Sequence, residues 1–436
     1  MIRHRLRLRS VCLLLAVCSG GCRPPAIAPA WVATYDDVAH GDDLAKTVAF
    51  SSQGDVIVGG CETCPNQNWN WRLAKYGATG VMRWSRTYDG AVRGSDCIQS
   101  VAVDRQDSVV ALGYESCAQP GPRHPSGGRP QIVYRWRVVK YDPAGRLDWA
   151  QPVRGEASLQ NAIPYGVATD QFDNVVAGGL ERYADGGGNP RIRGRLIKYS
   201  RGGIKLWSRS FGGPRGRDAW AQRIAIDKAG DVIVAGNSAP PASDTGRRGL
   251  VQKWTPDGRL AWEREYGDEA DHDSIAESVA VDHRGRIAVV GASGQRGQGE
   301  GLNWRVNQYD ASGSLLWSRA YGGADHGDDG ATSVAVDGKD RMIVAGVESR
   351  SMRWSIMFGS TSDPSAWRKR LHVLRFDADG TLLWSRDGPD DGTRYGCSVA
   401  SDGRGNFVLV GAQHKDDLGQ GDDWRVQYFK EEQSAP

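Results

Sequence analysis

The chain has 436 residues, of which 39% are hydrophobic and 25% charged, and it contains 57 glycines and 16 tryptophans. Its formal charge is +3, but four arginines fall within the first nine residues. Without residues 1–21 the chain keeps 51 basic and 52 acidic residues, a net charge of −1. This near-neutral balance lacks the basic footprint of a nucleic-acid-binding protein, so we expect no nucleic-acid partner.

Residues 1–22 have the pattern of a signal peptide, in which a basic segment precedes an apolar stretch too short to span a bilayer. Cys22 follows Ser19-Gly20-Gly21, which resembles a bacterial lipobox and implies lipidation of Cys22. The two glycines fit that pattern, whereas Ser19 stands where Leu is usual, so plain secretion stays open. We expect an exported protein, either an outer-membrane lipoprotein, periplasmic or extracellular, that meets the membrane only through such an anchor. Residues 23–30 are predicted to be a short linker.

From residue 31 onward the chain repeats a unit seven times. Each unit is anchored by a tryptophan, with spacings of 53, 65, 58, 55, 55 and 67 residues; these are Trp31, Trp84, Trp149, Trp207, Trp262, Trp317 and Trp384. Repeats of roughly this length indicate solenoids, propellers or arrays. The seventh unit ends at 424–430 without the strand that carries the anchoring tryptophan, and 31–35 is a spare copy of that strand. We therefore expect the two ends of the chain to pair.

Each unit reads as four strands. The first, as in 100–104, is apolar and built of small residues, and the second, as in 232–236, is apolar on both faces. The third, as in 136–141, alternates apolar with charged residues, and the fourth, as in 315–319, carries the tryptophan. This gradient from buried to half-exposed is the strand order of a propeller blade. The sequence predicts an all-β, seven-bladed β-propeller of four-stranded antiparallel blades over 31–430, followed by a tail at 431–436.

The turns support this assignment. First-to-second turns begin with Asp in six of the seven units, and third-to-fourth turns end in glycine. Such a turn needs a side-chain acceptor at its start and a residue tolerant of positive φ at its end. Because the pattern recurs wherever the repeat needs a turn, Asp377-Ala378-Asp379-Gly380 is interpreted as a turn rather than a calcium loop.

Two recurring motifs carry a family resemblance: S-V-A-V-D-x-x-G-x-x-I-V-A-G and K-Y-D-x-x-G-x-L-L-W-S-R-x-Y-G-G. They resemble bacterial secreted β-propeller repeats of the SBBP and delta-60 kind over about residues 31–430. Through D-x-x-G-x-L-x-W the unit also looks like the tryptophan-docking repeat of quinoprotein-like propellers. The resemblance implies the fold and leaves the function open, since such repeats serve many roles.

Four cysteines are candidates for structural disulfides in an oxidising compartment. Cys97 and Cys117 flank one predicted hairpin, which favours a bond between them. Cys61 and Cys64 are expected either to pair locally or to send one partner to Cys117. A C-x-x-C pair also occurs in redox and zinc sites, but no second pair at suitable spacing and no β-α-β context accompany it here.

The long insertions all fall at one end of the strands, in the connections from second to third and from fourth to the next first strand. They lie at 115–134, 181–194, 237–248 and 348–370. Since binding residues concentrate on loops carried by a rigid scaffold, this variable face is the predicted binding surface. The alternative is that the loop sequences vary only because changes there are tolerated.

Three features of that face are candidates for chemistry. H-G-D-D occurs twice and is echoed once, so the candidate metal ligands are His40, Asp42, Asp43, His272, Asp273, His326, Asp328 and Asp329. The alternative is that G-D-D caps a turn or holds a neighbouring segment. Three tryptophans fall outside the repeat positions and two loops are basic; the candidate ligand-binding residues are Trp220, Trp354, Trp367, Arg353 and Arg368.

The sequence contains no G-x-S-x-G elbow, phosphate-cradling glycine loop or H-E-x-x-H. It also lacks the adjacent cysteines expected of a quinoprotein dehydrogenase. We therefore expect an exported, non-enzymatic binding or scaffold protein that needs no cofactor and presents its variable face to a protein or glycan. The alternative is a metal-dependent enzyme or metal-binding propeller that uses a divalent ion at the His/Asp motifs.

Overall fold

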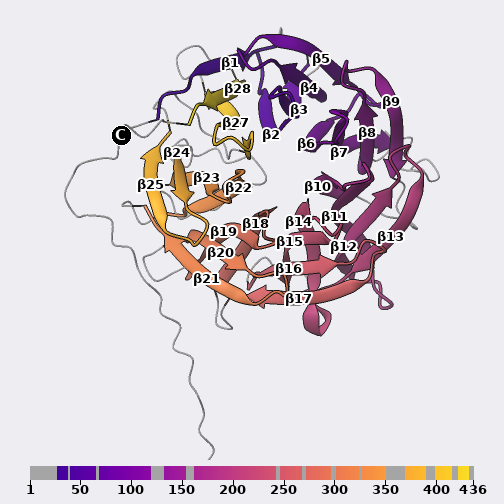
Figure 1. Ribbon diagram of the computed structural model, residues 1–436. Helices are drawn as coiled ribbons and strands as arrows, with labels where there is room; N and C mark the ends of the chain where they lie inside the picture. The colour runs from indigo at the N-terminus through magenta and orange to yellow at the C-terminus, as the bar shows by residue number, and fades with distance from the viewer. Residues whose placement is uncertain are drawn as a thin grey trace, which may run out of the picture.

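The computed structural model of the chain describes residues 27–37, 40–64, 68–118, 132–153, 162–241, 246–267, 272–295, 301–323, 327–349, 369–388, 398–414 and 421–431. These residues form seven four-stranded antiparallel sheets, which stand as blades around a common axis (Figure 1). Helix among the described residues is limited to the 3-10 turn η1 (Pro214–Gly216). None of the described helical residues makes a segment long and apolar enough to cross a membrane. The predicted all-β, seven-bladed propeller is confirmed.

Six blades are built of four consecutive strands, and the seventh combines the last three strands with the first. Blade 1 is β2 (Leu44–Phe50), β3 (Val56–Thr63), β4 (Trp69–Tyr76) and β5 (Met82–Tyr88); blade 2 is β6 (Cys97–Val103), β7 (Val109–Ala118), β8 (Ile132–Tyr141) and β9 (Leu147–Val153). Blade 3 is β10 (Ile163–Thr169), β11 (Val175–Ala184), β12 (Pro190–Tyr199) and β13 (Lys205–Phe211); blade 4 is β14 (Asp218–Ile226), β15 (Val232–Ala239), β16 (Arg248–Trp254) and β17 (Leu260–Tyr266). Blade 5 is β18 (His272–Val281), β19 (Ile287–Gln295), β20 (Asn303–Tyr309) and β21 (Leu315–Tyr321); blade 6 is β22 (Gly330–Val336), β23 (Met342–Ser349), β24 (Lys369–Phe376) and β25 (Leu382–Asp387). Blade 7 is β26 (Ser398–Ser401), β27 (Phe407–His414), β28 (Asp422–Phe429) and β1 (Trp31–Tyr35).

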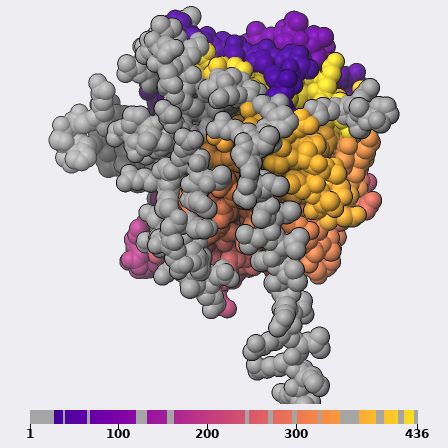
Figure 2. Space-filling view, turned by 90° about the vertical axis from the view of Figure 1, so that its left-hand side faces the viewer, coloured from indigo at the N-terminus to yellow at the C-terminus, as the bar shows by residue number. Residues whose placement is uncertain are grey.

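The ring closes through β1, as predicted. β1 pairs antiparallel with β28, from Trp31 opposite Tyr428 to Tyr35 opposite Trp424, and becomes the outer strand of blade 7. In Figure 2 the indigo N-terminal part of the chain lies directly against the yellow C-terminal part. The Trp31 ring stacks on Tyr428 at a centroid distance of 5.4 Å, and its Nε1–H donates to the carbonyl oxygen of Ala78 in blade 1 at 3.0 Å. One strand thus holds the last blade to the first.

Four more repeat tryptophans join their blade to the next in the same way. The indole N–H of the outer strand donates to a carbonyl in the third-to-fourth turn of the following blade, as from Trp84 to Pro143 at 3.2 Å and from Trp149 to Arg201 at 2.9 Å, and likewise from Trp207 and Trp262. Trp317 instead donates to Gln308 of its own blade. The ring covers the positive-φ glycine of the turn in the following blade. At Gly145, with φ +77°, an added Cβ would lie 2.8 Å from the Trp84 ring. The tryptophan and glycine of the repeat therefore form one contact, which packs neighbouring blades.

The face formed by the first-to-second and third-to-fourth turns is uniform, and we name it the turn face. Its first-to-second turns begin with an aspartate that has two roles. Oδ1 of Asp104 accepts the N–H groups of Gln106 and Ser108, while its Oδ2 lies 2.7 Å from Nζ of Lys140 on the third strand. The same pairing recurs in other blades, between Asp170 and Lys198, Asp227 and Lys253, and Asp337 and Arg375. The Asp and the Lys of the two repeat motifs are thus partners within a blade.

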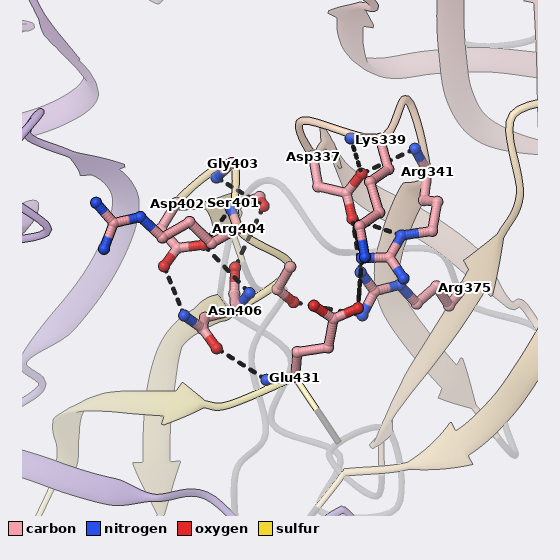
Figure 3. A network of polar contacts seen from close by, with 11 residues as sticks. Asp337, Lys339, Arg341, Arg375, Ser401, Asp402, Gly403, Arg404, Asn406 and Glu431 are labelled. Atoms are coloured by element: carbon pink, nitrogen blue, oxygen red, sulfur yellow. Dashed lines mark hydrogen bonds and ion pairs between the residues drawn. The ribbon is translucent and has the colours of Figure 1, made fainter. Parts of the chain in front are cut away.

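Figure 3 shows this turn-face network where blades 6 and 7 meet. Asp337 binds Arg341 and Arg375, and Arg341 also contacts the carboxylate of Glu431. The backbone N–H of Glu431 donates to the side chain of Asn406 on blade 7 at 2.8 Å. The first residue of the predicted tail is therefore tied to two blades.

The chain also packs onto the ring just before β1. Ile27 is buried in a core cluster with residues of blades 6 and 7, and the backbone N–H of Ala30 donates to the Tyr428 carbonyl at 2.7 Å. The described part of the predicted linker 23–30 is therefore in contact with the propeller.

The disulfide joins blades 1 and 2, from buried Cys61 on β3 to buried Cys97 on β6, with the Cα atoms 4.8 Å apart. The predicted bond between Cys97 and Cys117 is wrong, because the hairpin register places Cys97 opposite Tyr114 and leaves Cys117 three residues beyond it. The predicted bond between Cys61 and Cys64, and the alternative bond from one of them to Cys117, are also wrong, because Cys61 is bonded to Cys97 of the neighbouring blade. Cys64 and Cys117 are free thiols in the part of the chain that the structure describes.

Candidate functional site

The connections at the variable face differ from blade to blade and interrupt the regular pattern of the repeat. The turns of the turn face all lie within the described residues. The predicted insertion at 181–194 proves to be mostly strand, because β11 and β12 stay paired up to Ala184 opposite Pro190. At the other three predicted insertions, the second strand ends and the third begins far apart in sequence, for example at Ser349 and Lys369. The variable face is therefore carried by strand ends that are fixed in the ring.

The second Asp of G-D-D links two backbone segments within its own blade. Asp43 is fully buried, and its carboxylate accepts the backbone N–H groups of Asp37, at 2.8 Å, and Thr63, at 2.9 Å. Asp96 occupies the same place in blade 2 and accepts from Gly90 and Ser116. Burial raises the pKa of Asp43 to about 7 and that of Asp96 to about 6, against the opposing effect of these donors. Each carboxylate thus joins the segment before the first strand to the end of the second strand.

The first Asp of the motif reaches the preceding blade. The carboxylate of Asp328 accepts the N–H of Leu302 at 2.9 Å, and the N–H of Asp329 donates to the carbonyl of Leu302 at 2.6 Å. Asp42 and Asp43 make the equivalent pair of contacts with Asp422 across the closure, at 3.1 and 2.6 Å. Asp273 likewise accepts from Arg247 at 3.1 Å. These hydrogen bonds hold neighbouring blades together, which explains why G-D-D recurs.

Of the candidate metal ligands, Asp43 lies with two carboxylates that we did not predict, Asp36 and Asp37, at the closure. Oxygen atoms of Asp36, Asp37 and Asp43 lie within 4.8 Å of one another, a spacing that a cation could bridge. The exposed ring of His40 contacts Asp36 at 2.9 Å. Of the other two histidines, His326 and the side chain of His272 lie outside the described residues.

Of the candidate ligand-binding residues, Trp220 alone falls within the described chain; Trp354, Trp367, Arg353 and Arg368 lie outside it, as does Cys22. Trp220 is half-buried on β14, an innermost strand, opposite Asn237. It stands at the position that Leu44 and Ile163 hold in other blades. It therefore belongs to the inner ring near the variable face and not to a loop.

The structure shows a ring of residues that we did not predict. Each described innermost strand of blades 1 to 6 has a β-bulge at the same place, and a bulge leaves one residue unpaired and re-aims its side chain. The bulged residues are Lys46, Gln99, Tyr165, Gln222, Glu277 and Thr332. The glycine of V-I-V-A-G permits the bulge: a Cβ on Gly236 would lie 2.0 Å from the carbonyl oxygen of Trp220.

Some of these side chains converge, and we name Lys46, Tyr165, Gln222, Arg223 and Glu277 the inner polar cluster. The side-chain amide of Gln222 donates to Glu277 at 3.1 Å, and Arg223 donates to the carbonyl of Tyr165 at 2.7 Å. The residues come from blades 1, 3, 4 and 5, so the cluster lies around the axis of the ring. Thr332 in blade 6 instead donates its hydroxyl to Ala345 of its own blade.

Two ionisable side chains of the inner polar cluster have shifted pKa values. Burial raises the pKa of Glu277 to about 7, although Arg223 and the Gln222 hydrogen bond favour the carboxylate. Burial, with Arg223 as the second cause, lowers the pKa of Lys46 to about 8. Perturbed groups of this kind cluster at functional sites, and they also occur in structural networks. The cluster is suited to hold a polar ligand or to stabilise the ring.

Comparison with known proteins identifies the fold and no family. No family model matches the chain, and no curated protein matches it. A protein of unknown function from Dyadobacter fermentans has a TM-score of 0.50 at 9% identity, covering 93% of this chain and 100% of that one. The polysaccharide lyase Uly1 has a TM-score of 0.54 at 11% identity, covering 96% and 94%. These similarities define a seven-bladed β-propeller, and the resemblance to secreted propeller repeats stays a prediction.

Proposed function

We propose that this chain is an exported, non-enzymatic binding or scaffold protein that presents one face of a closed propeller to a protein or glycan partner. The observation that carries the proposal is the contrast between the two faces. The turn face is built of similar turns, and in four blades the aspartate that begins the first-to-second turn is fixed to the third strand by an ion pair. The variable face carries the connections that differ between blades, and Trp220 stands at its inner edge. Rigid scaffolds that bear variable loops are suited to recognition.

The disulfide supports export, because such bonds form and persist in oxidising compartments. Lipidation of Cys22 would tether the propeller to a membrane surface and leave its variable face accessible. The mass of the N-terminal peptide of the mature protein separates the two forms: a lipidated Cys22 at the N-terminus supports the anchor, and an unmodified peptide supports free secretion.

The partner is best sought by proximity labelling in the native cell envelope together with a glycan array. Each hit is then purified and its affinity measured against three variants. Trp220→Ala alters the inner edge of the variable face, Arg368→Ala alters the predicted insertion 348–370, and Lys339→Ala removes an exposed charge from the turn face as the matched control. We expect the first two to weaken binding by at least tenfold and the third to leave it unchanged. Equal loss in all three, or loss in the control alone, would contradict the proposal.

A second candidate function, a metal-dependent propeller, is favoured by the three carboxylates at the closure, Asp36, Asp37 and Asp43. Its test is the metal content of the purified protein and of Asp37→Asn. One bound divalent ion that is lost in the variant would support this function, and unchanged stability under chelation would remove it.

A further inference from the structure

Two of the described seams between neighbouring blades are locked by the same set of three side chains. The tyrosine that ends an outer strand donates its hydroxyl to a glutamate on the second strand of the next blade, as from Tyr88 to Glu115 at 2.7 Å. An arginine on the third strand of that blade pairs with the same glutamate and lies over the tyrosine ring; for Arg137 these distances are 3.2 and 4.4 Å. The guanidinium neutralises the buried carboxylate, and we name this arrangement the seam lock.

The closure uses the same lock. Tyr35 donates to Glu62 at 2.9 Å, while Arg72 pairs with Glu62 at 2.8 Å and stacks on the Tyr35 ring at 3.2 Å. Two successive seams thus have the same chemistry. This regularity makes a departure from it informative.

Blade 6 departs from the lock at two positions. Tyr321 and Glu348 are retained, with a 2.8 Å hydrogen bond, but His372 stands where five of the other six blades have arginine; blade 4 has Leu250 there. The tyrosine ring stacks on the imidazole, with centroids 4.9 Å apart, as it stacks on the guanidinium elsewhere. In addition, Asp387 on the outer strand of this blade lies opposite His372 in the ladder, at the position that Thr87 holds in β5 and Ala320 holds in β21. The arginine has been replaced by a side chain that can bind a metal ion, and a carboxylate has been added.

The three donors have the spacing of a metal site. Nδ1 of His372 lies 2.9 Å from Oδ1 of Asp387 and 3.5 Å from Oε1 of Glu348, and the set lies within 4.8 Å. Bonds of 2.0–2.1 Å in tetrahedral geometry place ligand atoms about 3.3 Å apart, between the two measured separations. Small side-chain shifts would bring all three donors onto one ion.

The surroundings orient these donors. The other ring nitrogen of His372, Nε2, lies 2.8 Å from the hydroxyl of Ser385, which leaves Nδ1 available to a metal. The buried imidazole stacks on the Tyr321 ring and meets the Trp304 ring edge-on. The side chains of Glu348 and Asp387 keep 13% and 15% of their surface exposed, so an ion can reach them from solvent. Arg370 approaches the other Glu348 oxygen at 3.6 Å and stands at the rim.

We propose that Glu348, His372 and Asp387 form a binding site for a divalent transition-metal ion such as Zn²⁺. One imidazole and two carboxylates are ligands that Zn²⁺ accepts, and a water molecule would complete four-coordination. The ion would supply, between blades 5 and 6, the positive charge that arginine supplies in the other seam locks. The site lies at the base of the connection between β23 and β24, so the ion would fix the strand ends that carry it. It is separate from the carboxylates at the closure and does not depend on the identity of the partner.

The test uses the full chain after chelation and dialysis, with Zn²⁺ added as the probe. Native mass spectrometry and calorimetry give stoichiometry and affinity, and thermal unfolding gives the effect on stability. We expect one ion per chain at this site, a higher unfolding temperature with Zn²⁺, and much weaker binding of Ca²⁺, which prefers oxygen ligands. The variant His372→Arg restores the lock of the other blades, so it should fold, lose this ion with at least a tenfold fall in affinity, and unfold at a temperature independent of Zn²⁺.

Two control variants distinguish this site from others. His283→Gln removes an exposed histidine that pairs with Asp340 at 2.9 Å, and it should leave Zn²⁺ binding unchanged. Asp37→Asn alters the carboxylates at the closure and should also leave it unchanged. Absence of Zn²⁺ binding by the wild-type chain would overturn the proposal. So would Zn²⁺ binding that persists in His372→Arg or disappears in either control.

Discussion

The most specific energetic prediction concerns Glu277 in the inner polar cluster. Its pKa is about 7 in the folded protein, against 4.5 for the unperturbed group, so between these values the folded state binds more protons than the unfolded state. The unfolding free energy must then fall as the pH rises through this window. Each pH unit between the two pKa values is equivalent to about 1.4 kcal/mol, which sets the contribution of Glu277 at about 3 kcal/mol. Glu277 therefore adds its full contribution to the unfolding free energy below pH 4.5, and this contribution is lost above pH 7.

The substitution Glu277→Gln removes this titration and keeps an acceptor for the Gln222 amide. We expect the stability of the variant relative to wild type to increase by up to about 3 kcal/mol between pH 4.5 and pH 8. Urea unfolding at a series of pH values measures the difference. Glu263→Gln, which removes a carboxylate from the outer strand β17, is the matched control and should follow the wild type. If Glu277→Gln also follows the wild type, or if its relative stability falls with pH, the reasoning is refuted.

Three further changes probe how the repeat works, each measured by chemical or thermal unfolding. Gly236→Ala should lower the unfolding free energy by about 1–3 kcal/mol, because its Cβ would lie 2.0 Å from a backbone oxygen of the first strand. The control Gly186→Ala, whose Cβ would have nothing within 4 Å, should change it by less than about 0.5 kcal/mol. Replacing Cys61 and Cys97 by serine opens a bond between residues 36 apart and should cost about 4 kcal/mol, and a reductant should have no further effect on that variant. Tyr88→Phe should cost about 1.5–3 kcal/mol through its lost hydrogen bond to a carboxylate, and an unchanged midpoint would remove the seam lock as a source of stability.

The repeat made the fold predictable. Trp31–Tyr35 could be assigned to the last blade because a unit with three strands needs a fourth, and no contact had to be known in advance. The cysteine pairing failed because Cys61 and Cys97 belong to different blades. Sequence periodicity describes a single sheet and its hairpins, whereas the distance between sheets depends on how they pack around the axis.

The candidate site was predictable only in part. The G-D-D motifs were identified, but their buried oxygens accept backbone N–H groups, an assignment that requires coordinates. The bulged residues were missed because an extra residue in a strand does not alter composition. Their signal was present nonetheless: the position before S-V-A-V varies from Lys46 to Glu277 while its neighbours repeat. His372 was missed because Leu371-His372-Val373 departs from W-R-V at two positions together.

The central claim is that the chain closes on itself through its N-terminal strand, and a cross-link tests it most directly. Ala33 lies opposite Val426 in the register of β1 and β28, and Gln427 is the next residue, with its side chain on the other face of the strand. Under mild oxidation, Ala33→Cys with Val426→Cys should form a disulfide within one chain, detected as a linked peptide in the monomer, and Ala33→Cys with Gln427→Cys should not. Cross-linking between chains, no cross-link, or equal yield in the two variants would contradict the closure.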